Sequence, residues 1–140
     1  MRVMVLVKAD ERSETEASPT RDELAEMGKF NDQLVKAGVM LAADGLKPSS
    51  AGKRVRFDAD NRSSVIDGPF AESKELVAGF WIWEVSSLEE AVEWLQRSPF
   101  RGTEVEIRPI WEAEEFDATF NSERREADQR QHDEIPTSEQ

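Results

Sequence analysis

The stretch Leu76–Val85 (LVAGFWIWEV) constrains the fold most, because it predicts a strand that is apolar on both faces. Successive side chains of a strand point to opposite sides. Phe80 and Ile82 therefore face one way, while Trp81 and Trp83 face the other. A strand of this kind is buried on both sides in folded proteins. The fold must supply a cover for each face.

Residues 1–8 predict a second strand of the same kind. Its apolar residues alternate, with Val3, Val5 and Val7 on one face and Met4 and Leu6 on the other. A polar and charged loop is expected over residues 9–20.

Two helices are predicted, over residues 20–37 and 87–97. Ser18-Pro19 resembles an N-cap with proline at the first helical position, and Thr20–Glu23 can form a capping box. Ser87–Glu90 predicts a second capping box. The expected apolar stripes are Leu24, Met27, Phe30 or Asn31, and Leu34 in the first helix, and Leu88, Ala91, Val92 and Leu95 in the second. Gly38 is expected to end the first helix.

Four further strands complete the pattern. Residues 39–43 form one strand, which the turn Asp44-Gly45 closes. Residues 53–58 and 63–66 form a hairpin, with Val55 and Phe57 inward. Residues 104–111 form the last strand, with Trp111 on its apolar face.

The order of elements predicts an α+β fold of the ferredoxin-like βαββαβ type with an extra hairpin. Both helices of this fold cover one face of the sheet, and here the other face is also apolar. An apolar face of that size needs a cover. We expect an obligate homodimer through the sheet faces. The alternative is that the C-terminal tail folds back over its own sheet.

The domain is expected to span residues 1–111, followed by an acidic tail over 112–140. The net charge is −12, and the tail contributes −7 of it, with 10 acidic and 3 basic residues. Such a field disfavours nucleic acid and anionic membranes as partners. The tail predicts a helix carrying Phe116 and Phe120, and then a disordered end from His132.

Several classes of chemistry are not expected. The chain has no cysteine, and its only histidine is His132 in the tail. A thiolate site, a Ser-His-Asp triad, a bound metal and a cofactor are therefore not predicted. No signal sequence or apolar stretch of membrane-spanning length is present, which predicts a cytoplasmic protein.

The segment Asp67-Gly68-Pro69-Phe70 has two interpretations. In the structural one, Asp67 caps the backbone two residues on, Gly68 supplies a positive φ and Phe70 anchors a tight corner. In the functional one, Asp67 is a carboxylate at a cleft mouth that acts as a base or binds a ligand. Phe70 is a candidate ligand contact in this interpretation. The neighbouring Glu72 and Lys74 are candidates as well, because a turn requires neither.

A second group of charged residues could line a cleft of the dimer. Asp44 is either an ordinary turn residue or a second candidate base. Arg56 and Arg108 could converge with Asp44 and Asp67 on a small polar ligand. The four tryptophans are expected in the core or at an interface, with an aromatic-lined ligand cavity as the minority interpretation.

The sequence resembles the DGPF-type branch of the YCII-related superfamily. The blocks that carry the resemblance cover residues 38–49, 67–75, 78–85, 86–95 and 105–116. The resemblance implies a dimeric ferredoxin-like α+β barrel and, from gene neighbourhoods, a link to extracytoplasmic-function sigma factors. Members closer to YciI carry a His-Asp pair proposed as an active site. This chain has no histidine in its domain, so that chemistry is not expected here.

Two functional classes follow. The first is a dimeric module that binds a small molecule or a protein partner and acts in regulation. The second is an enzyme using carboxylate acid/base chemistry in the dimer cleft, with Asp67 or Asp44 as the base. A carboxylate in a desolvated pocket would favour the enzyme.

Overall fold

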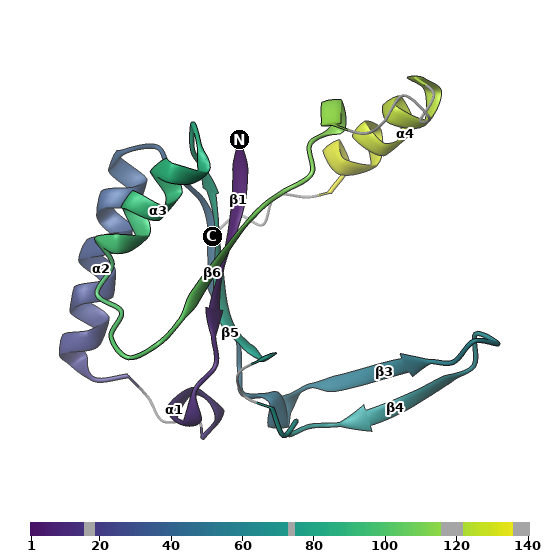
Figure 1. Cartoon of the computed structure of the whole chain (residues 1–140), viewed down its shortest axis with the longest axis horizontal. Helices are drawn as coiled ribbons and strands as arrows, with labels where there is room; N and C mark the ends of the chain where they lie inside the picture. The colour runs from purple at the N-terminus through teal and green to yellow at the C-terminus, as the bar shows by residue number, and fades with distance from the viewer. Residues whose placement is uncertain (16–18, 73–74, 116–121, 136–140) are drawn as a thin grey trace. The chain divides into compact units, whose positions relative to one another are not determined.

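The computed structural model describes residues 1–15, 19–72, 75–115 and 122–135. The chain divides into two compact units, Met1–Pro109 and Ile110–Gln140, which are described separately. The first contains β1 (Arg2–Lys8), α1 (Glu11–Glu14), α2 (Arg21–Lys36), β2 (Met40–Gly45), the 3-10 turn η1 (Ser49–Ala51), β3 (Lys53–Phe57), β4 (Ser63–Asp67), β5 (Val77–Glu84), α3 (Leu88–Gln96) and β6 (Val105–Pro109) (Figure 1). The second contains η3 (Ala113–Glu115) and α4 (Ser122–Asp133).

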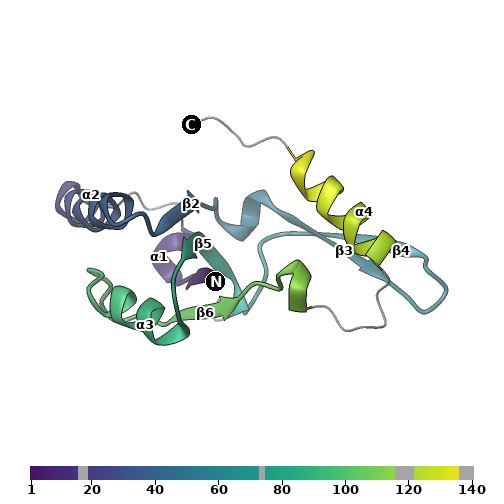
Figure 2. The same cartoon turned by 90° about the horizontal axis from the view of Figure 1, so that it is seen from above.

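The first unit is built on a four-stranded antiparallel sheet with the order β2-β5-β1-β6. Strands β3 and β4 pair only with each other and form a separate two-stranded sheet. Helices α2 and α3 lie on one face of the larger sheet (Figures 1 and 2). This arrangement confirms the predicted α+β ferredoxin-like fold with an extra hairpin.

The core lies between the sheet and its two helices. Trp83 is fully buried, and Phe30 and Leu34 of α2 pack in the same cluster. Ala91 of α3 is also fully buried. The other buried members are Val3, Val5 and Trp81 in the strands, and Val39 and Val85 next to strand ends. The alternation seen in the sequence therefore assigned the faces of β1 and β5 correctly.

The opposite face of the sheet carries the other apolar set. Met4 lies opposite Ile82, and Leu6 lies opposite Phe80. All four side chains are only half-buried in the single chain. Both α2 and α3 pack on the tryptophan face, so neither helix covers this second apolar face.

The helix starts differ in detail from their predictions. Residues 11–14 form α1 within the expected loop, because Asp10 and Ser13 cap each other reciprocally. The N-cap of α2 is Thr20, whose capping box with Glu23 is confirmed, so Pro19 lies outside the helix. Ser18 lies outside the described residues.

At the start of α3, only half of the predicted capping box forms. The Ser87 hydroxyl accepts the Glu90 N–H, but the Glu90 carboxylate accepts from the N–H and hydroxyl of Ser86 instead. These bonds hold the pKa of Glu90 below its ordinary value. Gly38 has a φ of +71° just beyond α2, as expected of a residue that ends a helix.

Two predictions about the shorter strands were wrong. Asp44 and Gly45 belong to β2, because they pair with Phe80 and Gly79 rather than forming a turn. Val55 and Phe57 do not face inward, since they are 52% and 64% exposed on the separate hairpin.

Toward the C-terminus, Trp111 lies beyond β6 and is 70% exposed. Helix α4 includes His132 and Asp133, which were expected to be disordered. The predicted aromatic anchors Phe116 and Phe120 lie outside the described residues. No helix in the described part of the chain is long and apolar enough to cross a membrane.

Candidate functional site

The Asp67–Phe70 corner directly follows β4. Asp67 is the last residue of that strand, and its carboxylate lies 2.5 Å from the ammonium group of Lys53. Its side chain is 76% exposed. The expected cap does not form, because the residue two positions on is Pro69, which has no N–H to donate.

Gly68 has a different role from the one predicted. Its φ is not positive. A Cβ at this position would lie 1.7 Å from the carbonyl oxygen of Ser49, so only glycine fits without a shift of the backbone. The Gly68 N–H also donates to the carbonyl of Gly52 at 3.1 Å. The Gly68–Pro69 peptide bond is cis.

Ser49 of η1 connects the corner to α1. Its hydroxyl accepts a hydrogen bond from the Phe70 N–H at 3.1 Å and donates to the carboxylate of Glu14. Its own N–H donates to the same carboxylate at 2.9 Å. Three segments that are distant in sequence therefore meet at one half-buried hydroxyl.

Phe70 completes the corner. The guanidinium of Arg54 lies 3.8 Å from the centre of the Phe70 ring, which is a cation–π contact. Each of Asp67, Gly68 and Phe70 thus has a contact within the corner or its neighbours. These contacts account for the motif as a joint between the hairpin and the rest of the unit.

The other charged candidates are dispersed. Glu72 is exposed, and Lys74 lies outside the described residues. Arg56 is exposed on the hairpin opposite Ser64. Arg108 is exposed on β6, where its nitrogen lies 3.7 Å from Glu106.

Asp44 is separated from Arg108 within one chain. Asp44 lies on β2, and β2 and β6 are the two outer strands of the sheet. Three strand spacings place the outer strands about 14 Å apart. The single chain therefore does not bring Asp44, Asp67, Arg56 and Arg108 together.

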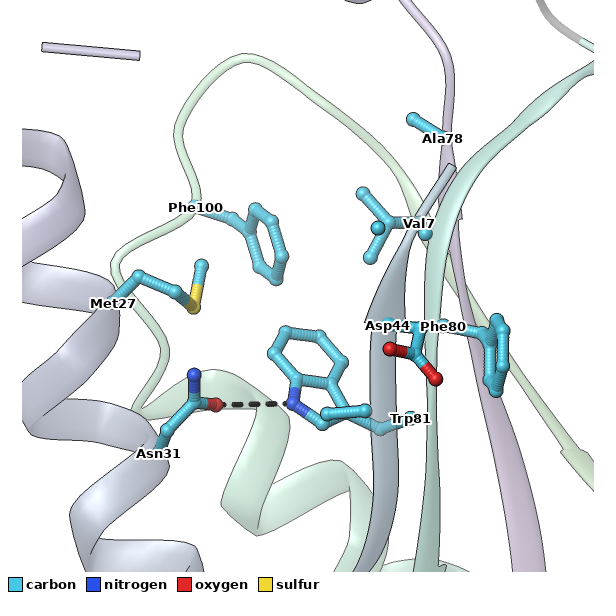
Figure 3. Close-up of a pocket in the computed structure, with 11 residues that line it drawn as sticks. Val7, Met27, Asn31, Asp44, Ala78, Phe80, Trp81 and Phe100 are labelled. Carbon is cyan, nitrogen blue, oxygen red and sulfur yellow. Dashed lines mark hydrogen bonds between the residues drawn. The ribbon is translucent and has the colours of Figure 1, made fainter. Parts of the chain in front are cut away.

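A cavity of about 330 Å³ lies between α2 and the sheet, and we name it the Trp81 cavity (Figure 3). Trp81 and Phe100 form its aromatic walls, with ring centres 5.8 Å apart in an edge-to-face arrangement. Asp44 is the one earlier candidate at its edge. The remaining lining residues are Val7, Met27, Asn31, Ala43, Gly45, Ala78, Gly79 and Phe80.

A single hydrogen bond orders the polar part of this cavity. The indole N–H of Trp81 donates to the side-chain oxygen of Asn31 at 3.0 Å (Figure 3). By contrast, the indole N–H of Trp83 is buried and has no hydrogen-bond partner among the residues that the structure describes. The two tryptophans of β5 therefore differ, since one contributes only to the core and the other also lines a cavity.

An adjoining cavity of about 450 Å³ shares Met27 and Phe100 with the first. Its wall includes Arg12, which donates to both carboxylate oxygens of Glu23 at 2.9 and 3.3 Å. The Arg12 hydrogen bond, helped by the N–H of Thr20, lowers the pKa of Glu23. Glu23 therefore remains ionised at neutral pH, and this second cavity has charged walls.

Sequence reasoning did not single out Asn31, Met27 or Phe100 as site residues. One signal was present, because Asn31 is a polar residue next to Phe30 on an otherwise apolar helical stripe. No sequence pattern marked Phe100, which lies in the loop after α3.

The fold and the cavity together define a ferredoxin-like α+β domain with an aromatic-lined pocket between its first long helix and its sheet. The YCII-related domain matches residues 1–114, and the chain belongs to this family. The resemblance inferred from the sequence is thereby confirmed at the level of the family.

Two similar proteins extend the comparison. An uncharacterised protein of Rhizobium meliloti (strain 1021) is 31% identical over 116 residues, which are 79% of this chain and 92% of the relative. A 5-chloro-2-hydroxyhydroquinone dehydrochlorinase from Burkholderia phenoliruptrix AC1100 was solved in complex with 2,5-dihydroxybenzoquinone. It has 16% sequence identity and a TM-score of 0.47, covering 84% of this chain and 100% of that one. This likeness is too distant to bear on the site.

Proposed function

We propose that the chain is a small-molecule-binding module whose ligand occupies the Trp81 cavity. This proposal rests on one observation: the cavity of about 330 Å³ has aromatic walls and one oriented polar side chain, Asn31. Small-molecule sites are commonly apolar clefts of about 300–1,000 Å³ with a few placed polar groups. The adjoining cavity would give a larger ligand room to extend past Phe100.

The proposal includes a homodimer through the sheet faces. Its support is the half-buried apolar set of Met4, Leu6, Phe80 and Ile82 on the face away from the helices. A second copy across a two-fold axis would remove this surface from water. Sedimentation equilibrium at micromolar concentration tests it, and a monomer would contradict this part of the proposal.

A regulatory role fits such a module, since a ligand that favours one state can change contact with a partner such as a sigma factor. The alternative is an enzyme, and the cavity favours Asp44 over Asp67 as its base. Asp44 lies at the cavity edge, whereas Asp67 is engaged with Lys53 at the corner. An enzyme would convert its bound ligand, and Asp44→Asn would stop this conversion.

Binding is tested by a thermal-shift screen of neutral aromatic compounds, followed by calorimetry on the hits. A ligand that binds only the native state raises the melting temperature by mass action. Hits should raise the melting temperature of the wild type, and most of this rise should be lost in the Phe100→Ala variant. The matched control is Phe57→Ala, because Phe57 is exposed on the hairpin and should not affect the hits.

Two results would contradict the proposed function. One is that no aromatic compound binds the wild type. The other is that hits bind the folded Phe100→Ala variant as tightly as they bind the wild type, which would place them outside the Trp81 cavity.

A further inference from the structure

The hydrogen bond between Trp81 and Asn31 fixes which way the Asn31 amide points. An indole N–H can only donate, so the atom of Asn31 that faces it must be the oxygen. The amide NH₂ group must then point elsewhere. Figure 3 shows the Asn31 nitrogen on the side of the cavity where Met27 and Phe100 lie.

This NH₂ group has no acceptor among the residues that the structure describes. It makes no hydrogen bond to any residue that the structure describes. Its cavity neighbours Met27, Phe100 and Trp81 offer a thioether, which is a weak acceptor, and two ring faces. The Asn31 nitrogen is not among the buried polar atoms without a partner in the described part of the chain, so solvent can reach it. A ligand that displaces this solvent must supply an acceptor in its place, or the donor is left unpaired.

The charge around the cavity indicates whether the acceptor group of the ligand is anionic or neutral. Asp44 lies at the cavity edge, and residues 1–111 carry a net charge of −5, with 20 acidic and 15 basic residues. Both disfavour an anionic group relative to a neutral one. A neutral carbonyl on an apolar or aromatic framework satisfies the donor without this penalty.

We propose that Asn31 is the specificity-determining residue of the Trp81 cavity and selects neutral aromatic carbonyl compounds by donating to the carbonyl oxygen. This inference rests on the proposed function, because it requires the cavity to bind a ligand. The Trp81 indole acts as a positioning group that holds the amide in its donating orientation.

The test compares acetophenone with α-methylstyrene, in which a CH₂ group replaces the carbonyl oxygen in a molecule of similar shape. The measured quantity is the ratio of their two affinities, so that differences in hydrophobicity cancel between proteins. Asn31→Asp keeps an acceptor for Trp81 but has no donor for the ligand, and Asn31→Leu is the uncharged counterpart. Both should reduce the preference for acetophenone by about tenfold, as expected when a ligand loses a paired hydrogen bond.

The matched control is Gln33→Glu, which adds the same charge as Asn31→Asp to an exposed position of α2. It should leave the ratio unchanged. An unchanged ratio in both Asn31 variants, with both probes still bound, would overturn the role of Asn31 and leave the proposed function standing. Failure of both probes to bind the wild type would overturn the selection of aromatic carbonyl compounds by Asn31, whereas the proposed function would be contradicted only if no aromatic compound bound.

A measurement on the wild type covers the case in which the variants do not fold. Donation from Asn31 would shift the carbonyl stretch of bound acetophenone to lower wavenumber than in a hydrocarbon solvent. A stretch at the hydrocarbon value would overturn the inference.

Discussion

The corner at Asp67–Phe70 and the Trp81 cavity differ in what they offer a ligand. The corner has the more distinctive sequence motif, but the cavity has the polar group that is available for binding. At the corner, the N–H of Gly68 donates to the carbonyl of Gly52, just after η1, and the N–H of Phe70 donates to the hydroxyl of Ser49 in η1. In the cavity, the amide nitrogen of Asn31 makes no hydrogen bond to any part of the chain that the structure describes. The N–H groups of Gly68 and Phe70 are therefore not free to donate to a ligand, whereas the amide N–H groups of Asn31 are.

The two regions also differ in their contribution to the stability of the fold. The corner holds together segments that lie far apart, because Ser49 bonds both Phe70 and Glu14. The cavity is formed by side chains that also pack on the core, such as Trp81. Changes at the corner should therefore reduce stability, and changes at the cavity should reduce binding.

The largest expected effect is that of Gly68→Ala. The added Cβ would lie 1.7 Å from a backbone oxygen, so the joint must open or shift. We expect a loss of more than about 3 kcal/mol in the free energy of unfolding, measured by urea denaturation. The control is Gly28→Ala in α2, where nothing lies within 4 Å of the new Cβ. It should raise stability by up to about 1 kcal/mol. Equal midpoints for Gly68→Ala and the wild type would show that the corner is not a rigid joint.

The second prediction concerns the hydroxyl that links the corner to α1. Ser49→Ala leaves the Phe70 N–H without its acceptor and removes one donor from Glu14. The expected loss is about 1–3 kcal/mol, because the groups concerned are half-buried. Ser50→Ala, at the exposed neighbouring position, should change stability by less than about 0.5 kcal/mol. If the two variants melt together, the network contributes nothing beyond the turn itself.

The parts of the fold that could be predicted from sequence are those set by local periodicity. The buried faces of β1 and β5 followed from alternation, and the start of α2 followed from the pairing of Thr20 with Glu23. The helix α1 was missed because a four-residue helix carries no apolar period, and only the reciprocal Asp10–Ser13 caps mark it.

The candidate site was less predictable because its determinants are distant in sequence. The need for glycine at position 68 comes from the approach of Ser49, which no pattern around the motif reveals. The orientation of Asn31 depends on Trp81, which lies 50 positions away. A distinctive local motif therefore attracted the functional interpretation, while the cavity was assembled from residues that looked like ordinary core.

The smallest expected effect on stability is that of Asp67→Asn, and it tests the contrast most directly. The Lys53–Asp67 pair is exposed on both sides, with 66% and 76% of the two side chains accessible. Exposed pairs contribute about 0–1 kcal/mol and are screened by salt. The melting temperature should therefore change little, and the small change should vanish at high salt.

Ligand binding by Asp67→Asn should equal that of the wild type, since Asp67 is not among the residues that line the Trp81 cavity. The same substitution at Asp44, at the cavity edge, should alter the affinity of the hits. The opposite pattern, with binding lost in a fully folded Asp67→Asn protein and retained in Asp44→Asn, would mean that the corner is the ligand site. In that case the joint would be the functional element, and the apolar cavity would be a packing defect beside the core.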